Sequence, residues 1–160
     1  MRRATPKDAR AIERLIRPVF EAQVAPTLEE TGRRTFRAFV TAPALAGRLS
    51  AGSPAFLVEG SDGRPVAYGE RDGAHIRLMF VALDRQGNGV SRLLLEALIA
   101  DVEAPAVTLN SSDFARARYE SLGFTATGPR TMVNGIVHTP MMKPLDGMDA
   151  RVGTEKENAP

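Results

Sequence analysis

The feature of this sequence that most constrains its fold is the glycine-rich segment Gln86-Gly87-Asn88-Gly89, which lies between a predicted strand and a predicted helix. Residues 75–81 supply the strand, and residues 90–102 carry an apolar stripe at helical spacing. Pro105 breaks that helix, and residues 106–110 read as a short strand. Because this second strand follows a strand and a helix, we expect it to pair parallel with residues 75–81 as a βαβ unit.

The segments on either side of this unit predict a mixed α/β (α+β) sheet rather than a regular doubly wound one. Before the unit, the patterns predict a helix capped by Thr5 and kinked or ended by Pro18, a helix opened by a capping box at residues 27–30, a helical piece over 43–49, and antiparallel strands over 55–58 and 65–70. After it, they predict a helix from Ser112 to Ser121 ended by Gly123 as a left-handed cap, a strand from Phe124, and a hairpin turned by Asn134-Gly135. The predicted order is strand, two helices, three strands, helix, strand, helix and two strands.

The composition favours one ordinary globular domain. The chain has 160 residues, of which 43% are hydrophobic and 25% are charged, so one core can form. Residues 146–160 are polar and lack apolar periodicity, which predicts a single domain over residues 1–145 and a disordered tail. The sequence contains no cysteine and only two histidines, His75 and His138, so we expect no metal site.

The chain ends and the net charge bear on location and partners. The N-terminal segment lacks the apolar core of a secretory signal, and no apolar run approaches the roughly 18 residues that span a bilayer. We therefore expect a cytoplasmic protein without a membrane partner. A net charge of only +2 argues against nucleic acid as a partner. The cluster Arg33, Arg34 and Arg37 leaves two readings open, a solvated helix face and a basic contact patch.

The glycine-rich turn has the properties of an anion site. Glycines permit positive φ and close backbone approach to a ligand, and the first amides of the following helix have no partner within the helix. The helix dipole adds a preference for negative charge, so a pyrophosphate fits this position, although a plain tight turn is an equal alternative. The turn lacks the Gly-Lys-Ser/Thr ending of nucleotide-triphosphatase loops and the third glycine of a dinucleotide fingerprint.

Two segments resemble the motifs of one family, the GNAT N-acetyltransferases. The signature of the family's acyl-coenzyme A motif is Arg or Gln, two residues, Gly, one residue, then Gly or Ala; Gln86 and Gly89 match it, while Ser91 departs. Residues 110–124 are similar to the family's second motif, in which an Asn or Ser start leads to Tyr-Glu-x-Leu-Gly-Phe. Five residues of this chain match that ending: Tyr119, Glu120, Leu122, Gly123 and Phe124. The resemblance covers residues 55–143.

This resemblance implies a fold, a reaction and a cofactor site. The fold would be a mixed, mostly antiparallel sheet of about six to seven strands, splayed at its middle and flanked by about four helices. The reaction would be acetyl-coenzyme A-dependent N-acetylation, with acetyl-coenzyme A as cosubstrate and an amine that attacks the thioester directly. Tyr119 would protonate the leaving thiolate as general acid; the alternative is a tyrosine that only packs in the core. The implied cofactor-binding residues are Phe80, Val81, Gln86, Gly87, Asn88, Gly89, Val90, Ser91, Asn110, Ser112 and Tyr119.

The acceptor and the base are less defined by the sequence. His75 lies where some family members carry a base, Glu70 is an alternative that would act through water, and water alone also suffices in many such enzymes. His138 lies toward the expected acceptor side without an assigned role. We expect a small-molecule amine as acceptor, with a protein amine as another class, and the resemblance also suggests a homodimer. A non-catalytic acyl-coenzyme A-binding or regulatory module on the same fold is the alternative to an enzyme.

Overall fold

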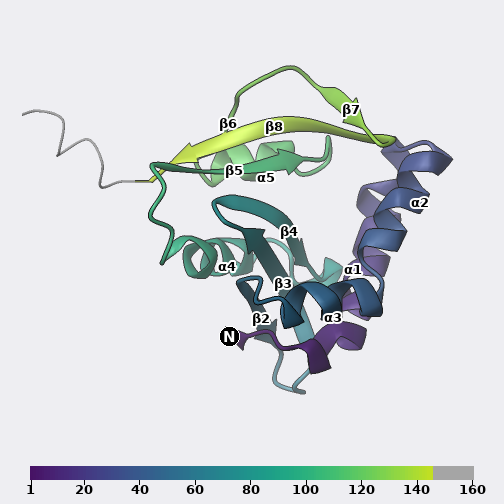
Figure 1. Cartoon of the computed structure of the whole chain (residues 1–160), viewed down its shortest axis with the longest axis vertical. Helices are drawn as coiled ribbons and strands as arrows, with labels where there is room; N and C mark the ends of the chain where they lie inside the picture. Colours follow the sequence, from purple (N-terminus) through teal and green to yellow (C-terminus); the bar gives the residue numbers. More distant parts are fainter. Residues whose placement is uncertain (146–160) are drawn as a thin grey trace, which may run out of the picture.

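The computed structural model of the protein describes residues 1–145, so the predicted tail at 146–160 lies outside the described residues. Figure 1 shows the arrangement of the elements in space. Five α-helices, three short 3-10 helices and eight strands follow one another along the chain: β1 (Arg2–Arg3), η1 (Pro6–Asp8), α1 (Ala9–Gln23), η2 (Ala25–Thr27), α2 (Glu30–Phe39), α3 (Ala42–Ser50), β2 (Ala55–Glu59), β3 (Pro65–Asp72), β4 (His75–Val81), η3 (Leu83–Arg85), α4 (Val90–Ile99), β5 (Ala106–Ser111), α5 (Arg116–Ser121), β6 (Thr125–Ala126), β7 (Thr131–Val133) and β8 (Ile136–Pro144).

The strands form one mixed sheet in the order β1-β2-β3-β4-β5-β8-β6, with β7 paired to β8. Every pairing is antiparallel except that of β4 with β5, as the βαβ prediction required. That parallel ladder has only two residue pairs, His75 with Thr108 and Ile76 with Leu109. The two strands diverge beyond it, so the predicted splay is confirmed. The expected six to seven strands become eight, because the single strand predicted between Phe124 and the Asn134-Gly135 turn is divided into β6 and β7.

The two faces of the sheet carry separate hydrophobic clusters. Ala67 and Tyr68 are neighbours on β3 and point to opposite faces, as the two-residue period of a strand demands. The cluster on the Tyr68 side is built with α1, α2 and α3, and the cluster on the Ala67 side with α4 and α5. In Figure 1, β2–β4 lie below and β5 and β8 above, with α2 reaching between these two halves at the side.

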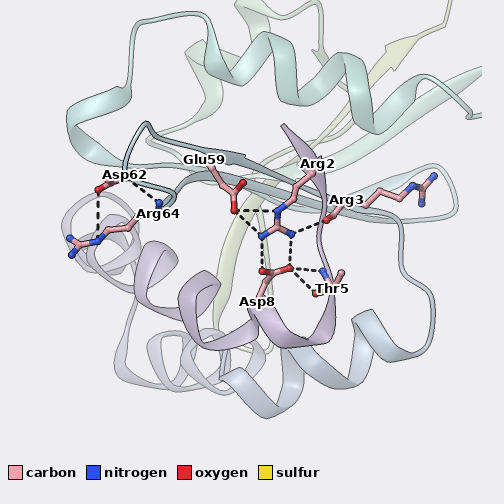
Figure 2. Close-up of polar contacts among 7 residues, drawn as sticks. All are labelled: Arg2, Arg3, Thr5, Asp8, Glu59, Asp62 and Arg64. Carbon is pink, nitrogen blue, oxygen red and sulfur yellow. Dashed lines mark hydrogen bonds and ion pairs between the residues drawn. The ribbon is translucent and has the colours of Figure 1, made fainter.

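An ion-pair network fastens the N-terminus to this sheet. Arg2 contacts Asp8 of η1 and Glu59 of β2, each at 2.8 Å (Figure 2). The amide and hydroxyl of Thr5 donate hydrogen bonds to the same Asp8 carboxylate. These contacts hold β1 against the edge of β2 and set the start of α1, where the sequence predicted a Thr5 cap.

Two helix boundaries differ from the sequence prediction. Pro18 does not end α1, which continues to Gln23, because the proline ring is exposed while Val19 and Phe20 behind it are buried in the core. The capping box at residues 27–30 is wrong, because the hydroxyl of Thr27 donates to the carbonyl of Val24 within η2. The helix α2 therefore starts only at Glu30.

The predicted ends of the later helices also shift. The helix α4 ends at Ile99 rather than at residue 102. The helix α5 begins at Arg116 rather than at Ser112, whose hydroxyl accepts a hydrogen bond from the amide of Ala115 and so stabilises the turn before it. Gly123 follows α5 with a φ of +92°, which confirms the left-handed cap.

Candidate active site

A cavity of about 720 Å³ opens where β4 and β5 diverge. Its lining comes from segments that are far apart in the sequence: α1, α2, β4, the loop before α4, the end of β5, α5 and the β7–β8 hairpin. The diverging strands leave edge backbone groups of β4 beyond Ile76 without a partner on β5. The sheet thus presents hydrogen-bonding groups to a ligand where the parallel β4–β5 ladder ends.

The side chain of Gln86 fixes one end of the loop before α4. Its Nε2 donates to the carbonyl of Val81 at 3.1 Å and to Oε1 of Gln23 at 3.0 Å, while Gln23 donates back at 2.9 Å. These bonds tie the loop both to the end of β4 and to α1. The position of the loop relative to the diverging strands is therefore held by side chains, not only by chain connectivity.

The backbone of residues 87–91 is arranged to receive an anion. Gly87 and Gly89 have φ values of +82° and +77°, and no atom lies within 4 Å of a Cβ placed on either glycine. Within the described chain, none of the five amides at positions 87–91 donates to a protein acceptor. Free amides at the start of α4, together with the helix dipole, favour a phosphate group.

Tyr119 projects from α5 into the same cavity. Its ring is 8% exposed and meets Phe124 edge to face, with the ring centroids 5.7 Å apart. Burial raises the pKa of the phenol to about 12, so the hydroxyl carries its proton at neutral pH. That hydroxyl makes no hydrogen bond to any residue within 1–145, unlike most buried tyrosine hydroxyls.

The helix α2 and the β7–β8 hairpin close the other end of the cavity. Asn134 and Gly135 turn the hairpin with φ values of +52° and +79°, which confirms the predicted two-residue turn. Gly32 of α2 packs backbone to backbone against Gly135: a Cβ on Gly32 would lie 2.0 Å from its carbonyl oxygen. Thr35 adds a hydrogen bond to the carbonyl of Asn134 at 3.0 Å. The helix α2 and the β7–β8 hairpin therefore frame this end of the cavity.

Three exposed apolar side chains surround this end. Phe39 of α2, Phe114 before α5 and Val133 of β7 all line the cavity and are 37%, 56% and 54% exposed. Phe36 lies deeper, stacked on Phe20 with ring centroids 4.2 Å apart. This end of the cavity thus presents exposed hydrocarbon, which suits a ligand with an apolar portion.

The ionisable side chains at this cavity include two imidazoles and a guanidinium. His75, Arg77 and His138 all line the cavity. His75 Nδ1 lies 2.8 Å from the Thr108 hydroxyl, and burial, followed by the positive charge of Arg77, lowers the pKa of His75 below its ordinary value. His138 Nδ1 lies 3.2 Å from the carbonyl oxygen of Ile136.

Glu70 lies on the face of β3 that packs against α3, and it is not among the residues that line the cavity. Its side chain is 0% exposed, which leaves no solvent path for the water-mediated base that the sequence suggested as an alternative. Arg48 Nε donates to one carboxylate oxygen at 2.6 Å, and the Tyr68 hydroxyl donates to the other at 2.8 Å. This environment is that of a structural ion pair in the core.

The sequence model described as "Acetyltransferase (GNAT) domain" matches residues 24–145. The chain belongs to the GNAT acetyltransferase family. The chain is similar to the GCN5-related N-acetyltransferase (aminotransferase, class-II) of Rhodopseudomonas palustris, at 25% identity and a TM-score of 0.75 over 90% of this chain and 94% of that one. No curated protein sequence matches the chain significantly.

Two ligand-bound structures share the fold of this GNAT domain. The PaiA N-acetyltransferase of Thermoplasma acidophilum, solved in complex with coenzyme A, is 12% identical with a TM-score of 0.70, over 90% of this chain and 97% of that one. The phosphinothricin acetyltransferase of Sinorhizobium meliloti, solved in complex with acetyl-coenzyme A, is 18% identical with a TM-score of 0.63, over 90% of this chain and 86% of that one.

The GNAT fold brings most of the predicted cofactor residues to one cavity. Seven of them line it: Phe80, Val81, Gln86, Ser91, Asn110, Ser112 and Tyr119. The other four, Gly87, Asn88, Gly89 and Val90, belong to the same loop but are not part of the lining. Their roles in binding stay predictions.

The sequence did not reveal several other lining residues. Gln23, Arg77 and Arg118 reach the cavity from α1, β4 and α5, and Phe39 and Phe114 reach its mouth. No sequence signal marks the two phenylalanines, because their exposure depends on the tertiary fold. Arg77 faces the cavity because β4 carries a bulge opposite Glu70 and Arg71, a feature without a sequence signature here.

Two further findings concern the described residues alone. None of the helices within 1–145 combines the length and apolarity that a membrane crossing requires. No three side chains of His, Asp or Glu in this part of the chain are grouped so that they could hold a metal ion.

Proposed function

We propose that this GNAT domain is an N-acetyltransferase in which an amine attacks acetyl-coenzyme A directly. The observation that carries the proposal is the juxtaposition of three features at one cavity. These are the interrupted β4–β5 ladder, the loop with free amides at residues 87–91, which reaches the cavity through Gln86 and Ser91, and the unbonded Tyr119 hydroxyl. A pantetheine arm suits the first, a pyrophosphate the second and a leaving sulfur the third.

The cofactor would enter along the loop before α4. Amides of residues 87–91 would donate to the pyrophosphate, and the hydroxyl of Ser91, which lines the cavity, adds a further donor. The pantetheine amides would pair with edge groups of Phe80 and Val81 that β5 leaves free. This arrangement directs the thioester toward Tyr119.

Tyr119 would act on the sulfur as the C–S bond breaks. With a pKa of about 12, its phenol is protonated throughout the physiological range. A thiol ordinarily has a pKa of about 8.5, so complete transfer from the free phenol would cost about 5 kcal/mol. Tyr119 therefore donates a hydrogen bond to the developing thiolate, and its proton moves fully only as the attacking nitrogen supplies another.

The acceptor we propose is a small-molecule amine with an apolar portion. The exposed Phe39, Phe114 and Val133 offer hydrocarbon contact at the mouth of the cavity, and Phe36 extends that surface inward. Burying such groups under a ligand gains about 25 cal/mol per Å² of apolar area. A protein N-terminus is the second acceptor class that an assay should include.

A thiol-release assay tests the proposal. Purified protein is mixed with acetyl-coenzyme A and single amines, and free thiol is followed with a thiol-reactive dye. The panel contains phenylethylamine, tryptamine, a short peptide, spermidine and kanamycin, and we expect the aromatic monoamines to react fastest. Tyr119→Phe serves as the matched control.

The outcomes separate an enzyme from a binding module. Thiol release that depends on an amine, and that falls in Tyr119→Phe, supports the enzyme. Binding of acetyl-coenzyme A by calorimetry without thiol release from any amine would instead indicate a non-catalytic acyl-coenzyme A-binding module. Absence of any binding at tens of micromolar cofactor would contradict both.

A further inference from the structure

His138 lies at the acceptor end of the cavity, on β8. It is half-buried, lines the cavity, and follows the hairpin that α2 holds in place through Gly32 and Thr35. The cavity contains the other imidazole of the chain as well, and the charge of His138 is among the influences on the pKa of His75. An amine between the mouth and the thioester would therefore lie beside this side chain.

One hydrogen bond determines which nitrogen of His138 carries the proton. Nδ1 lies 3.2 Å from the carbonyl oxygen of Ile136. A carbonyl oxygen only accepts hydrogen bonds, so Nδ1 must be the donor in the neutral ring. Nε2 then has its lone pair free, and no residue among 1–145 donates to it. A neutral imidazole fixed in this tautomer is ready to accept a proton.

The two groups that the sequence suggested as bases are placed less well for this role. His75 Nδ1 meets the hydroxyl of Thr108, which both donates and accepts, so its tautomer is not fixed. Glu70 is fully buried, outside the cavity lining, and both its oxygens already accept hydrogen bonds from Arg48 and Tyr68.

We propose that Nε2 of His138 is the base that removes the proton from the acceptor ammonium. The proposal rests on the proposed function and specifies its acceptor site. The R–NH3⁺ group gives one proton to Nε2, which forms an imidazolium. The neutral amine then forms the C–N bond while the C–S bond breaks. The second proton of the nitrogen ends on sulfur through Tyr119, and the imidazolium releases its proton to solvent.

Other charged groups near His138 shape any pH profile. His75 and Arg77 face the cavity from β4, and Arg118 and Tyr119 face it from α5. The strands β5 and β7, which pair with β8, contain no charged residue, and the cavity-lining residues of α2 contain none. Of these groups only His75 is a second imidazole, so His75 needs its own control.

The variant His138→Asn isolates the base. The Asn amide nitrogen can occupy the position of Nδ1 and keep the bond to Ile136, whereas nothing replaces Nε2. We expect kcat/KM for the amine to fall by about 10²- to 10⁴-fold, with an unchanged Kd for acetyl-coenzyme A. The remaining rate should rise tenfold per pH unit until the amine itself is deprotonated, and added imidazole should restore part of it. His138→Gln is the second variant, and His75→Asn is the matched control.

Each outcome decides the proposal. The proposal is overturned if His138→Asn or His138→Gln keeps a kcat/KM within threefold of wild type. It is also overturned if His75→Asn, and not the His138 variants, loses the dependence of kcat/KM on pH near neutrality. Nitrogen-15 NMR gives a readout independent of turnover: we expect the Nδ1–H tautomer for His138 above pH 8, and an Nε2–H tautomer overturns the proposal. If wild-type protein releases thiol with no amine, the proposed function fails and the base fails with it.

Discussion

Gly89 allows the phosphate-binding role of its loop to be tested, because backbone strain and charge can be varied separately there. The residue is the N-cap of α4 with a φ of +77°, and no atom lies within 4 Å of an added Cβ. A side chain therefore fits without a clash. It must still adopt the left-handed conformation, which costs an L-residue roughly 1–2 kcal/mol.

The size of the strain follows from a pair of matched glycines. Gly47 in α3 also has no atom within 4 Å of an added Cβ, but its φ is not positive. Gly47→Ala should raise the free energy of unfolding by about 1 kcal/mol, because alanine is the better helix former. Gly89→Ala should lower it by about 1 kcal/mol. Urea unfolding measures both, and changes of equal sign would refute the assigned backbone conformation.

Charge is then tested at constant strain with Gly89→Gln and Gly89→Glu. A carboxylate 4 Å from one phosphate charge costs about 1 kcal/mol in bulk water and about 4 kcal/mol at an effective dielectric of 20. The Kd for acetyl-coenzyme A should therefore be roughly fivefold to a thousandfold higher for Glu than for Gln. Calorimetric titration measures the ratio, which should shrink as salt is raised. Equal Kd values for the two variants would refute phosphate binding at this loop.

Four further outcomes follow from the structure. Tyr119→Phe should lower kcat by one to two orders of magnitude with an unchanged Kd for acetyl-coenzyme A, and unchanged turnover would remove the phenol from the reaction. Ser91→Ala should change that Kd by less than about threefold, because its hydroxyl is one donor among several. Gly69→Ala should cost about 1–3 kcal/mol in urea unfolding, since its Cβ would lie 2.6 Å from Leu98 Cδ1; a neutral effect would contradict tight packing there. Burial, and to a lesser extent the charge of Arg77, lowers the pKa of His75 in the folded state below 6.5. The unfolded chain therefore binds more protons at this residue below pH 6.5. The contribution of His75 to the free energy of unfolding is full above pH 6.5 and is lost as the pH falls toward the folded-state pKa. His75→Gln should flatten this fall in Tm between pH 7 and 5.5, and an equally steep fall in the variant would contradict the assignment.

Local patterns predicted the elements around the cofactor loop well. The strand at 75–81 matches β4 residue for residue, and the Asn134-Gly135 turn and Gly123 cap have the positive φ values expected of them. These features depend on the conformational preferences of one or two residues, which a neighbouring element rarely overrides. The sequence failed where distant contacts decide. Pro18 lies inside α1 because buried residues on both sides hold the helix together.

The candidate site divides in the same way. The cofactor half was predicted from residues 86–91 and 110–124, because free amides and positive φ are consequences of a short contiguous segment. The acceptor half was not. Phe39 and His138 come from distant segments, and the contact of Gly32 with the hairpin holds these segments together so that both side chains line one cavity.

The sequence by itself therefore determined the family and the parallel crossover after Gly89, and it named candidate residues for acetyl-coenzyme A whose binding stays a prediction. Only the tertiary structure decided which other side chains face the cavity. The packing of α3 on β3 buries Glu70 in the core, where Arg48 contacts it. The fold places His138 in the lining of the cavity, where its Nδ1 contacts a backbone carbonyl. The reason is physical: a turn or helix start depends on adjacent residues, whereas burial and the protonation state of an imidazole depend on what the rest of the chain places beside it.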